Sequence, residues 1–198
     1  MYILRQLSFI QLFSLLLLAG ACQEPAAKKP APAQAVYFDV PGFIQSQAAI
    51  LEKEDPRALK SVVENGQVQE RKTLQHLKWQ KELAAFSDLD LNKPAFRNSF
   101  LVSRQPDSAG LVTVTYRKKP GTASDIALLA ITSDANQQVH ALRATVENRN
   151  PLITTSQYLA LSCASKNGRF RIQTFQIGGR QKPLIFDPLQ YLIITEIQ

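Results

Sequence analysis

The second half of the chain constrains the fold most, because it is a succession of short β-rich runs separated by turn residues. In one run, Val112, Val114 and Tyr116 alternate with two threonines, the pattern of a strand with one dry face and one wet face. Most of the turn sequences are too short for the crossover that joins parallel strands. From Phe96 to Gln198 the sequence therefore predicts an antiparallel meander of about six to eight strands.

One of these runs changes phase. In a regular extended strand, Phe170 and Ile172 would lie on one face, and Phe175 and Ile177 would lie on the opposite face. The alternation of apolar residues therefore changes phase between Thr174 and Phe175. The change indicates either a β-bulge or a strand that is buried on both faces, and the sequence leaves both open.

An amphipathic helix is predicted from Gly42 to Leu51, where apolar residues recur at the spacing of one helix face. Asp39 is placed to cap its N-terminus, and Pro41 suits its first turn. The helix should end near Asp55-Pro56, because the residue before a proline resists helical backbone angles.

A polar hairpin and a second helix follow. Two extended runs, Leu59–Glu64 and Gln67–Leu74, flank Asn65-Gly66, a strong signal for a two-residue hairpin turn. The hairpin is polar, so we expect it at a sheet edge. From His76 to Phe86, apolar residues repeat with helical spacing and predict the second helix: Trp79, Leu83 and Phe86.

Together these elements predict one α+β domain over residues 36–198. Two N-terminal amphipathic helices, with the polar hairpin between them, would pack on a curved, mostly antiparallel six- to eight-stranded sheet. Without a shared motif, this layout resembles periplasmic carriers and β-lactamase-inhibitor-like modules.

The N-terminus has the pattern of a signal peptide, predicted over residues 1–21. One basic residue, Arg5, precedes an apolar run from Leu7 to Leu18, which ends in small residues directly before Cys22. The run is about a dozen residues long, against the roughly 20 that a membrane-spanning helix needs. The alternatives are an ordinary secretory peptide cut after Ala19 or Ala21, and an uncleaved membrane anchor.

The stretch Leu18-Ala19-Gly20-Ala21-Cys22 resembles the lipobox of signal peptidase II substrates. It departs from the usual pattern in having Ala19, rather than leucine, three residues before the cysteine. The resemblance covers about a tenth of the chain. It implies cleavage between Ala21 and Cys22, and a diacylglyceryl thioether and an acylated amino group on Cys22. The whole chain is also similar in style to lipoproteins of unassigned function from Bacteroidetes-type bacteria.

The next segment, residues 22–35, is predicted to be a tether. Beyond Cys22 it contains proline, alanine, lysine and other small or polar residues and no large apolar side chain, so it cannot contribute to a core. As extended polyproline II at roughly 3.1 Å per residue, it could hold the domain up to about 40 Å from the membrane. By resemblance to enterobacterial sorting rules, Gln23 after the cysteine favours the outer membrane of a Gram-negative cell envelope.

The formal net charge of the chain is +7, and it is +6 without the signal peptide, whose only charge is Arg5. In an envelope protein the acidic partners are lipid head groups, phosphates or another protein rather than nucleic acid. After Cys22 the only other cysteine is Cys163, which alternates with Leu159 and Leu161 and is predicted to be a small buried residue.

No catalytic set is evident, and no cofactor or metal is expected. Asp88, Asp90 and Asn92 match the opening of a calcium-binding EF-hand loop, but Lys93 replaces the glycine at the sixth position and Ser99 the glutamate at the twelfth. We therefore interpret this stretch as an exposed loop that follows a helix. The predicted function is a membrane-anchored, non-enzymatic binding or assembly module for a protein or an acylated ligand. The alternative is an envelope hydrolase or glycan-active enzyme that uses carboxylates such as Asp88 and Asp90.

Overall fold

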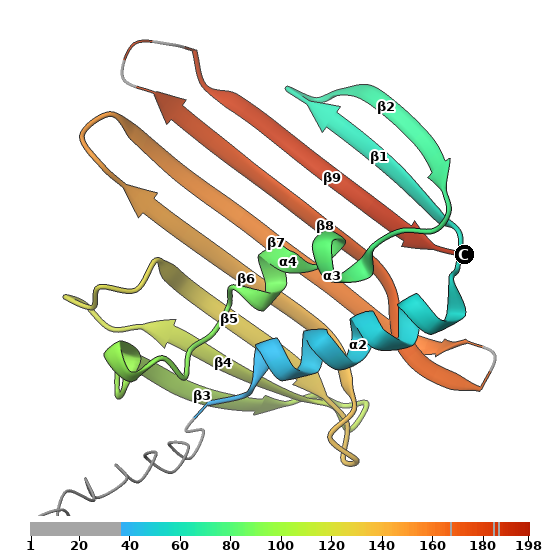
Figure 1. The fold of residues 1–198 in the computed structure, drawn as a ribbon. Helices are drawn as coiled ribbons and strands as arrows, with labels where there is room; N and C mark the ends of the chain where they lie inside the picture. Colours follow the sequence, from blue (N-terminus) through green and yellow to red (C-terminus); the bar gives the residue numbers. More distant parts are fainter. Residues whose placement is uncertain (1–36, 167, 184, 186) are drawn as a thin grey trace, which may run out of the picture. The chain divides into compact units, whose positions relative to one another are not determined.

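The computed structural model describes residues 37–166, 168–183, 185 and 187–198. The predicted signal peptide, Cys22 and the tether lie outside these residues. The described chain forms one open antiparallel sheet of nine strands, in the order β2-β1-β9-β8-β7-β6-β5-β4-β3, with its helices on one face (Figure 1). The elements are α2 (Val40–Glu54), β1 (Ala58–Glu64), β2 (Gln67–Leu74), α3 (Trp79–Glu82), α4 (Ala84–Ser87), η1 (Pro94–Phe96), β3 (Phe100–Pro106), β4 (Val112–Lys118), β5 (Ile126–Ser133), β6 (Val139–Arg149), β7 (Ile153–Lys166), β8 (Arg169–Pro183) and β9 (Leu189–Ile197).

Helix α2 forms where the sequence predicts it, and local signals set both of its ends. The side chain of Asp39 accepts a hydrogen bond from the backbone N–H of Gly42, at 3.0 Å, and so caps the first turn. The helix ends at Glu54 because Asp55, before the proline, adopts left-handed backbone angles with φ of 45°.

The prediction of one continuous second helix is wrong. In place of one helix from His76 to Phe86, the chain forms the four-residue helices α3 and α4, which are separated at Leu83, with φ of −97° and ψ of 6°. Trp79, Leu83 and Phe86 are all fully buried, so the predicted apolar stripe is present. The helix starts late because His76 has a positive φ, of 55°.

The hairpin lies at a sheet edge, as predicted, with β2 as the edge strand. Its other strand, β1, pairs with β9, and Ala58 faces Ile197 at one end of this ladder. The predicted sheet of six to eight strands is therefore too small. The meander from β3 to β9 agrees with the prediction, but the hairpin adds two strands to it, giving nine in all.

The phase change in β8 is a β-bulge. Ser162 of β7 pairs with Thr174 and the next residue, Cys163, pairs with Ile172, so Gln173 is the extra residue. The bulge allows both Ile172 and Phe175 to be fully buried.

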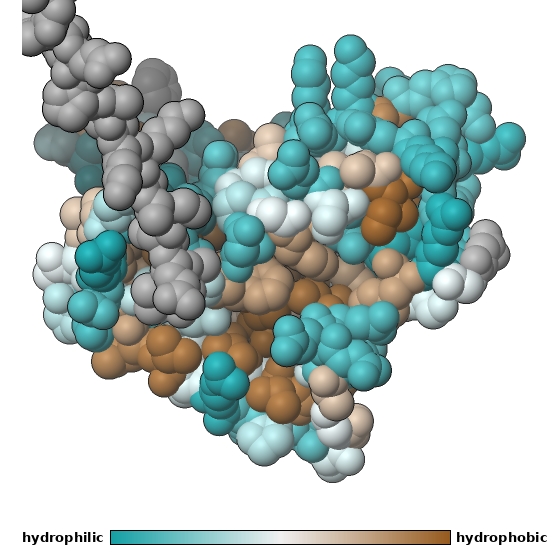
Figure 2. All heavy atoms as spheres, turned by 60° about the horizontal axis from the view of Figure 1, so that its bottom comes forward, coloured by the Kyte–Doolittle hydropathy of each residue, from teal (hydrophilic) through white to brown (hydrophobic). Residues whose placement is uncertain are grey.

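The core lies between the helices and one face of the sheet. Val40, Ile44, Ala48 and Leu51 of α2 meet residues of the sheet such as Leu161. The rings of Phe86 and Phe175 contact each other edge to face, with centroids 6.1 Å apart. The helices do not close this core completely, because Figure 2 shows apolar side chains in a hollow framed by hydrophilic residues.

Candidate functional site

The histidines and acidic residues do not form a metal site in the part of the chain that the structure describes. No three His, Cys, Asp or Glu side chains are grouped there so as to hold a metal ion. His140 lies 3.3 Å from Asp134 and packs on the ring of Phe170, with centroids 4.9 Å apart. His76 pairs with Asp55 on the surface, 2.6 Å apart.

The structure separates Asp88 from Asp90. Asp90 accepts a hydrogen bond from the backbone N–H of Asn92, at 2.8 Å. The side chain of Asn92 in turn accepts from the N–H of Tyr37 and donates to its carbonyl, at 2.9 and 3.1 Å. Asp90 and Asn92 therefore hold the start of the domain in place, whereas Asp88 lines a pocket.

This side pocket has a volume of about 380 Å³ and lies between the segment that follows α4 and the strands β5, β6 and β7. Leu89, Phe96 and Val146 are among its apolar lining residues. Its polar lining includes two carboxylates and one lysine: Asp88, Asp125 and Lys93.

The side pocket has an ordered polar wall. Asp125 accepts a hydrogen bond from the side-chain amide of Asn148, at 3.0 Å, and its carbonyl accepts one from the N–H of Glu147, at 2.8 Å. Ser124 is buried, and its hydroxyl oxygen accepts from the N–H of Ile126, at 3.1 Å. These bonds fix the loop before β5 and give Asp125 a defined position.

Beside the pocket, apolar side chains cover a part of the sheet that no helix crosses. Ile177 of β8 pairs with Leu159, which belongs to the core, and with Ile193 of β9, which pairs with Val62 of β1. Residues paired side by side share a face, so these side chains point to the helix side. In Figure 1 no helix lies in front of the ends of β6 and β8 or the starts of β7 and β9. We use the name open floor for five partly buried residues of this face beside the core: Val62, Val146, Ile177, Tyr191 and Ile193.

Tyr191 crosses the open floor. Its ring lies over Gly179, the residue with which it pairs on β8, and its hydroxyl oxygen is 3.5 Å from the side-chain nitrogen of Gln157 on β7. Gln157 also lines the side pocket. The tyrosine and the glutamine thus connect the pocket to the floor.

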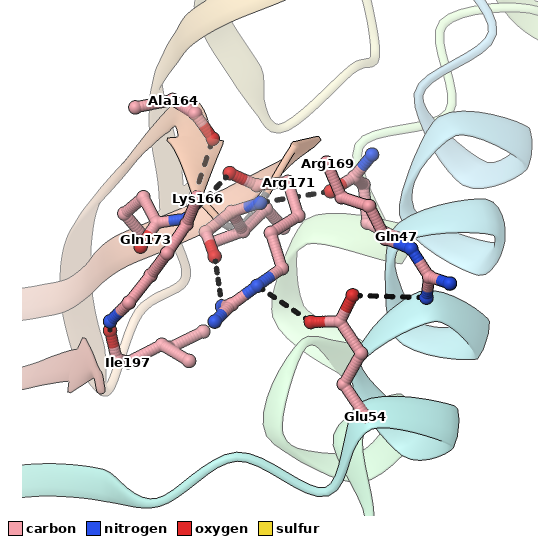
Figure 3. Close-up of polar contacts among 9 residues, drawn as sticks. Gln47, Glu54, Ala164, Lys166, Arg169, Arg171, Gln173 and Ile197 are labelled. Atoms are coloured by element: carbon pink, nitrogen blue, oxygen red, sulfur yellow. Dashed lines mark hydrogen bonds and ion pairs between the residues drawn. The ribbon is translucent and has the colours of Figure 1, made fainter.

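At the opposite end of the domain, a cluster of charged residues fixes α2 to β8 (Figure 3). Arg171 is only 3% exposed, and its Nε lies 2.8 Å from Oε2 of Glu54, an ion pair that is not aligned as a hydrogen bond. Arg169 reaches the other oxygen of the same carboxylate, at 3.2 Å. Gln47 of α2 accepts a hydrogen bond from the N–H of Ile172, at 2.9 Å. This cluster is structural, because its groups are directed at each other rather than at a cavity.

Cys163 is buried, as predicted, and burial raises the pKa of its thiol to about 12. A thiol with such a pKa is protonated at neutral pH and is a poor nucleophile. Cys163 is therefore part of the core rather than a reactive group.

Sequence reasoning missed the side pocket and the open floor. Asp125, Gln157 and Tyr191 come from distant parts of the chain, and only the strand register brings them to one surface. The apolar residues of the floor did have a signal, because Ile177 and Ile193 lie in strands with apolar alternation.

Neither the hydrophobicity of the helices nor comparison with known proteins assigns a function to the chain. None of the helices in the described part of the chain has the length and hydrophobicity needed to cross a membrane. No protein-family model, no curated protein and no solved structure matches the chain.

Proposed function

We propose that the protein is a lipid-anchored lipoprotein of the bacterial cell envelope, and that its domain binds the acyl chain of a ligand on the open floor without catalysis. The observation that carries the proposal is the row formed by Ile177, Ile193 and Val62, apolar side chains on the helix side of the sheet that stay partly exposed. A sheet face that meets only water is usually polar. An apolar row in this position favours an apolar ligand.

The side pocket supports an amphipathic ligand rather than a purely apolar one. Lys93, Asp88 and Asp125 line the pocket next to the floor, so they can contact a polar head group while the acyl chain lies along the floor. Lys93 is held near the ring of Phe96, with Nζ 5.9 Å from the ring centroid. A ligand with a zwitterionic head group fits this set of charges, because its cation can contact the carboxylates and its anion can contact Lys93.

The anchor rests on the resemblance of the segment before Cys22 to a lipobox. An acylated Cys22 would keep the domain at a membrane, and the outer membrane of a Gram-negative cell is the proposed location. Two or three acyl chains give a lasting attachment, whereas one gives weak and reversible binding. A tethered domain of this kind would meet acylated molecules at the same surface.

Titration of the full chain, held in amphipol, with a fluorescent lysophosphatidylethanolamine tests the proposal. Replacement of Ile193 by serine should weaken binding about tenfold, because burial of an isoleucine side chain contributes about 1.5–3 kcal/mol and tenfold in affinity corresponds to about 1.4 kcal/mol. The matched control is Ile194→Ser, one residue further along β9 and on the other face of the sheet. Absence of binding, or an equal loss in both variants, would contradict the proposal.

A second candidate function is an envelope hydrolase or glycan-active enzyme. The observation that favours it is that Asp88 and Asp125 line the same pocket, since paired carboxylates can serve as general acid and base. Asp90, the other predicted carboxylate, is not among the lining residues. Assays with nitrophenyl glycosides and esters test this function, and activity that disappears in both Asp88→Asn and Asp125→Asn, with folding intact, would support it.

A further inference from the structure

Two neighbouring hairpins expose large apolar side chains at their tips. The turn between β6 and β7 carries Leu152, which is 73% exposed, and the connection between β8 and β9 carries Ile185, which is 84% exposed. These are the two most exposed large hydrophobic residues in the described part of the chain. Ile153 pairs with Pro183, so the β6–β7 turn lies beside the end of β8, at the same end of the sheet.

The turn that carries Leu152 is well defined. The side chain of Asn150 accepts hydrogen bonds from the N–H groups of Leu152 and Ile153, both at 2.9 Å. The N–H of Asn150 donates to the carbonyl of Ile153, at 3.1 Å. A pocket of about 220 Å³ between the hairpins is lined by residues of both, including Leu152 and Pro183. The exposure of Leu152 is therefore set by an ordered turn.

Basic residues lie directly behind the tips. Arg149 of β6 pairs with Thr154 of β7, which pairs with Lys182 of β8, so the two cations lie on the same face with one threonine between them. Arg180 lies on this face two residues before Lys182. Within the described residues, none of the three has a carboxylate within ion-pair distance. The acidic residues nearest in the pairing and in the chain are Glu147 and Asp187.

Two turns at the other end of the sheet lack this combination. The β3–β4 turn, residues 107–111, contains only small residues and Asp107 before Leu111, which is partly buried. The β5–β6 turn contains Asp134, Ala135 and polar residues. Solvated turns normally have such compositions. The apolar tips with adjacent cations thus differ from these two turns.

We propose that these two hairpin tips dock into the surface of a membrane that contains anionic lipids. Leu152 and Ile185 would enter the boundary between head groups and acyl chains, and the three cations would lie against lipid phosphates. Peripheral proteins bind membranes by this combination of apolar insertion and electrostatic attraction. The charge of the tips selects the occupant, because free cations beside exposed apolar side chains match an anionic bilayer.

Docking at the tips would bring the nearby end of the open floor toward the bilayer, with the cations on the opposite face of the sheet. The floor is formed by the ends of β6 and β8 and the starts of β7 and β9, and the same strands carry the tips. An acyl chain could then pass between membrane and floor without crossing water. This last consequence rests on the proposed function, whereas the docking itself does not.

Fluorescence of the full chain in vesicles of phosphatidylethanolamine and phosphatidylglycerol tests the proposal. Leu152→Cys and Ile185→Cys would each be labelled with an environment-sensitive nitrobenzoxadiazole group, with Ala135→Cys in the β5–β6 turn as the control. Labelling should be confined to the introduced thiol, because Cys163 is buried and protonated and the proposed anchor occupies Cys22. Labels at 152 and 185 should emit at shorter wavelength and be quenched by spin-labelled lipid, and the label at 135 should not.

Charge variants and lipid composition complete the test. Replacing phosphatidylglycerol by phosphatidylcholine, or combining Arg149→Gln with Lys182→Gln, should reduce the quenching at least about twofold, since each cation near an anionic surface contributes about 1 kcal/mol. The proposal would be overturned if the labels at 152 and 185 were as exposed to water as the label at 135. It would also be overturned if both tips could be cross-linked to a protein and showed no quenching by lipid. Ile193→Ser should leave the quenching unchanged, so that failure of docking is distinguished from failure of the floor to bind a ligand.

Discussion

The ring of Tyr191 occupies the space that a side chain at Gly179 would need. A Cβ atom at position 179 would lie 2.7 Å from the tyrosine hydroxyl oxygen and 2.8 Å from two ring carbons. The glycine therefore allows the ring to lie flat across β8 and to reach Gln157 on β7. An aromatic ring over a strand glycine covers backbone that would otherwise be exposed.

Gly179→Ala should destabilise the domain by about 1–2 kcal/mol, because the added methyl group forces the tyrosine ring off the sheet. In a Tyr191→Ala background the same substitution should be neutral or stabilising, because the space is then free and alanine loses less backbone entropy than glycine on folding. Urea unfolding of the four proteins measures this coupling. Equal costs in both backgrounds would show that the ring does not occupy this space in solution.

Glu54→Gln should destabilise the domain by about 2–3 kcal/mol. The substitution leaves the nearly buried guanidinium of Arg171 without a counter-charge, and breaking a buried pair costs about 3–5 kcal/mol, reduced here because the Glu54 side chain is 22% exposed. Glu52→Gln, on the exposed side of the same helix, is the matched control and should change stability by less than about 0.5 kcal/mol. The stability of both variants can be compared through the midpoints of denaturant unfolding, with the same dependence of the unfolding free energy on denaturant concentration for each protein.

The stability of the domain should fall as pH rises above about 9. Burial raises the pKa of Cys163 from its ordinary 9.0 to about 12, so the unfolded chain loses this proton at a lower pH than the folded one. The contribution is fully present below pH 9 and is lost progressively as pH rises toward 12. Cys163→Ala should have a flatter stability profile in this range, measured by urea unfolding from pH 8 to 11. An unchanged slope in the variant would show that other groups titrate instead.

Cys22→Ser should prevent lipidation and leave the protein in soluble extracts. The expected readout is loss of incorporated radiolabelled palmitate together with loss of the protein from the membrane fraction. Cys163→Ala keeps Cys22 and should be labelled like the wild type. Label that persists in the Cys22→Ser variant would refute the anchor.

Sequence reasoning succeeded where the signal is local. The cap at Asp39 and the turn at Asn65-Gly66 each depend on a few consecutive residues, and the structure confirms both. Near Thr174 the sequence left two interpretations open, and the structure has the β-bulge. Sequence reasoning failed at the helix break, because leucine is an ordinary helix residue and nothing in the local sequence marks Leu83, which is fully buried in the core, as the point of the break.

The candidate site depends on long-range pairing and was beyond local signals. In the sequence, Asp88 stands out because its spacing from Asp90 and Asn92 resembles that of calcium ligands. Its position in the same pocket as Asp125 depends on where the segment after α4 crosses the sheet. The position of the β6–β7 turn beside the end of β8 requires the register between β7 and β8. The periodicity of apolar residues shows which face of a strand is buried, but it does not show which strand lies beside it.

The ladder between β1 and β9 joins the first strand of the domain to the last. The N-terminal hairpin leaves the ribosome long before β9 exists, so the edge of β1 that does not pair with β2 stays unpaired until β9 has been made. The complete sheet therefore cannot form until β9 has been made. Truncation of the last nine residues would expose β1 along its full length and leave two unpaired edges prone to aggregation.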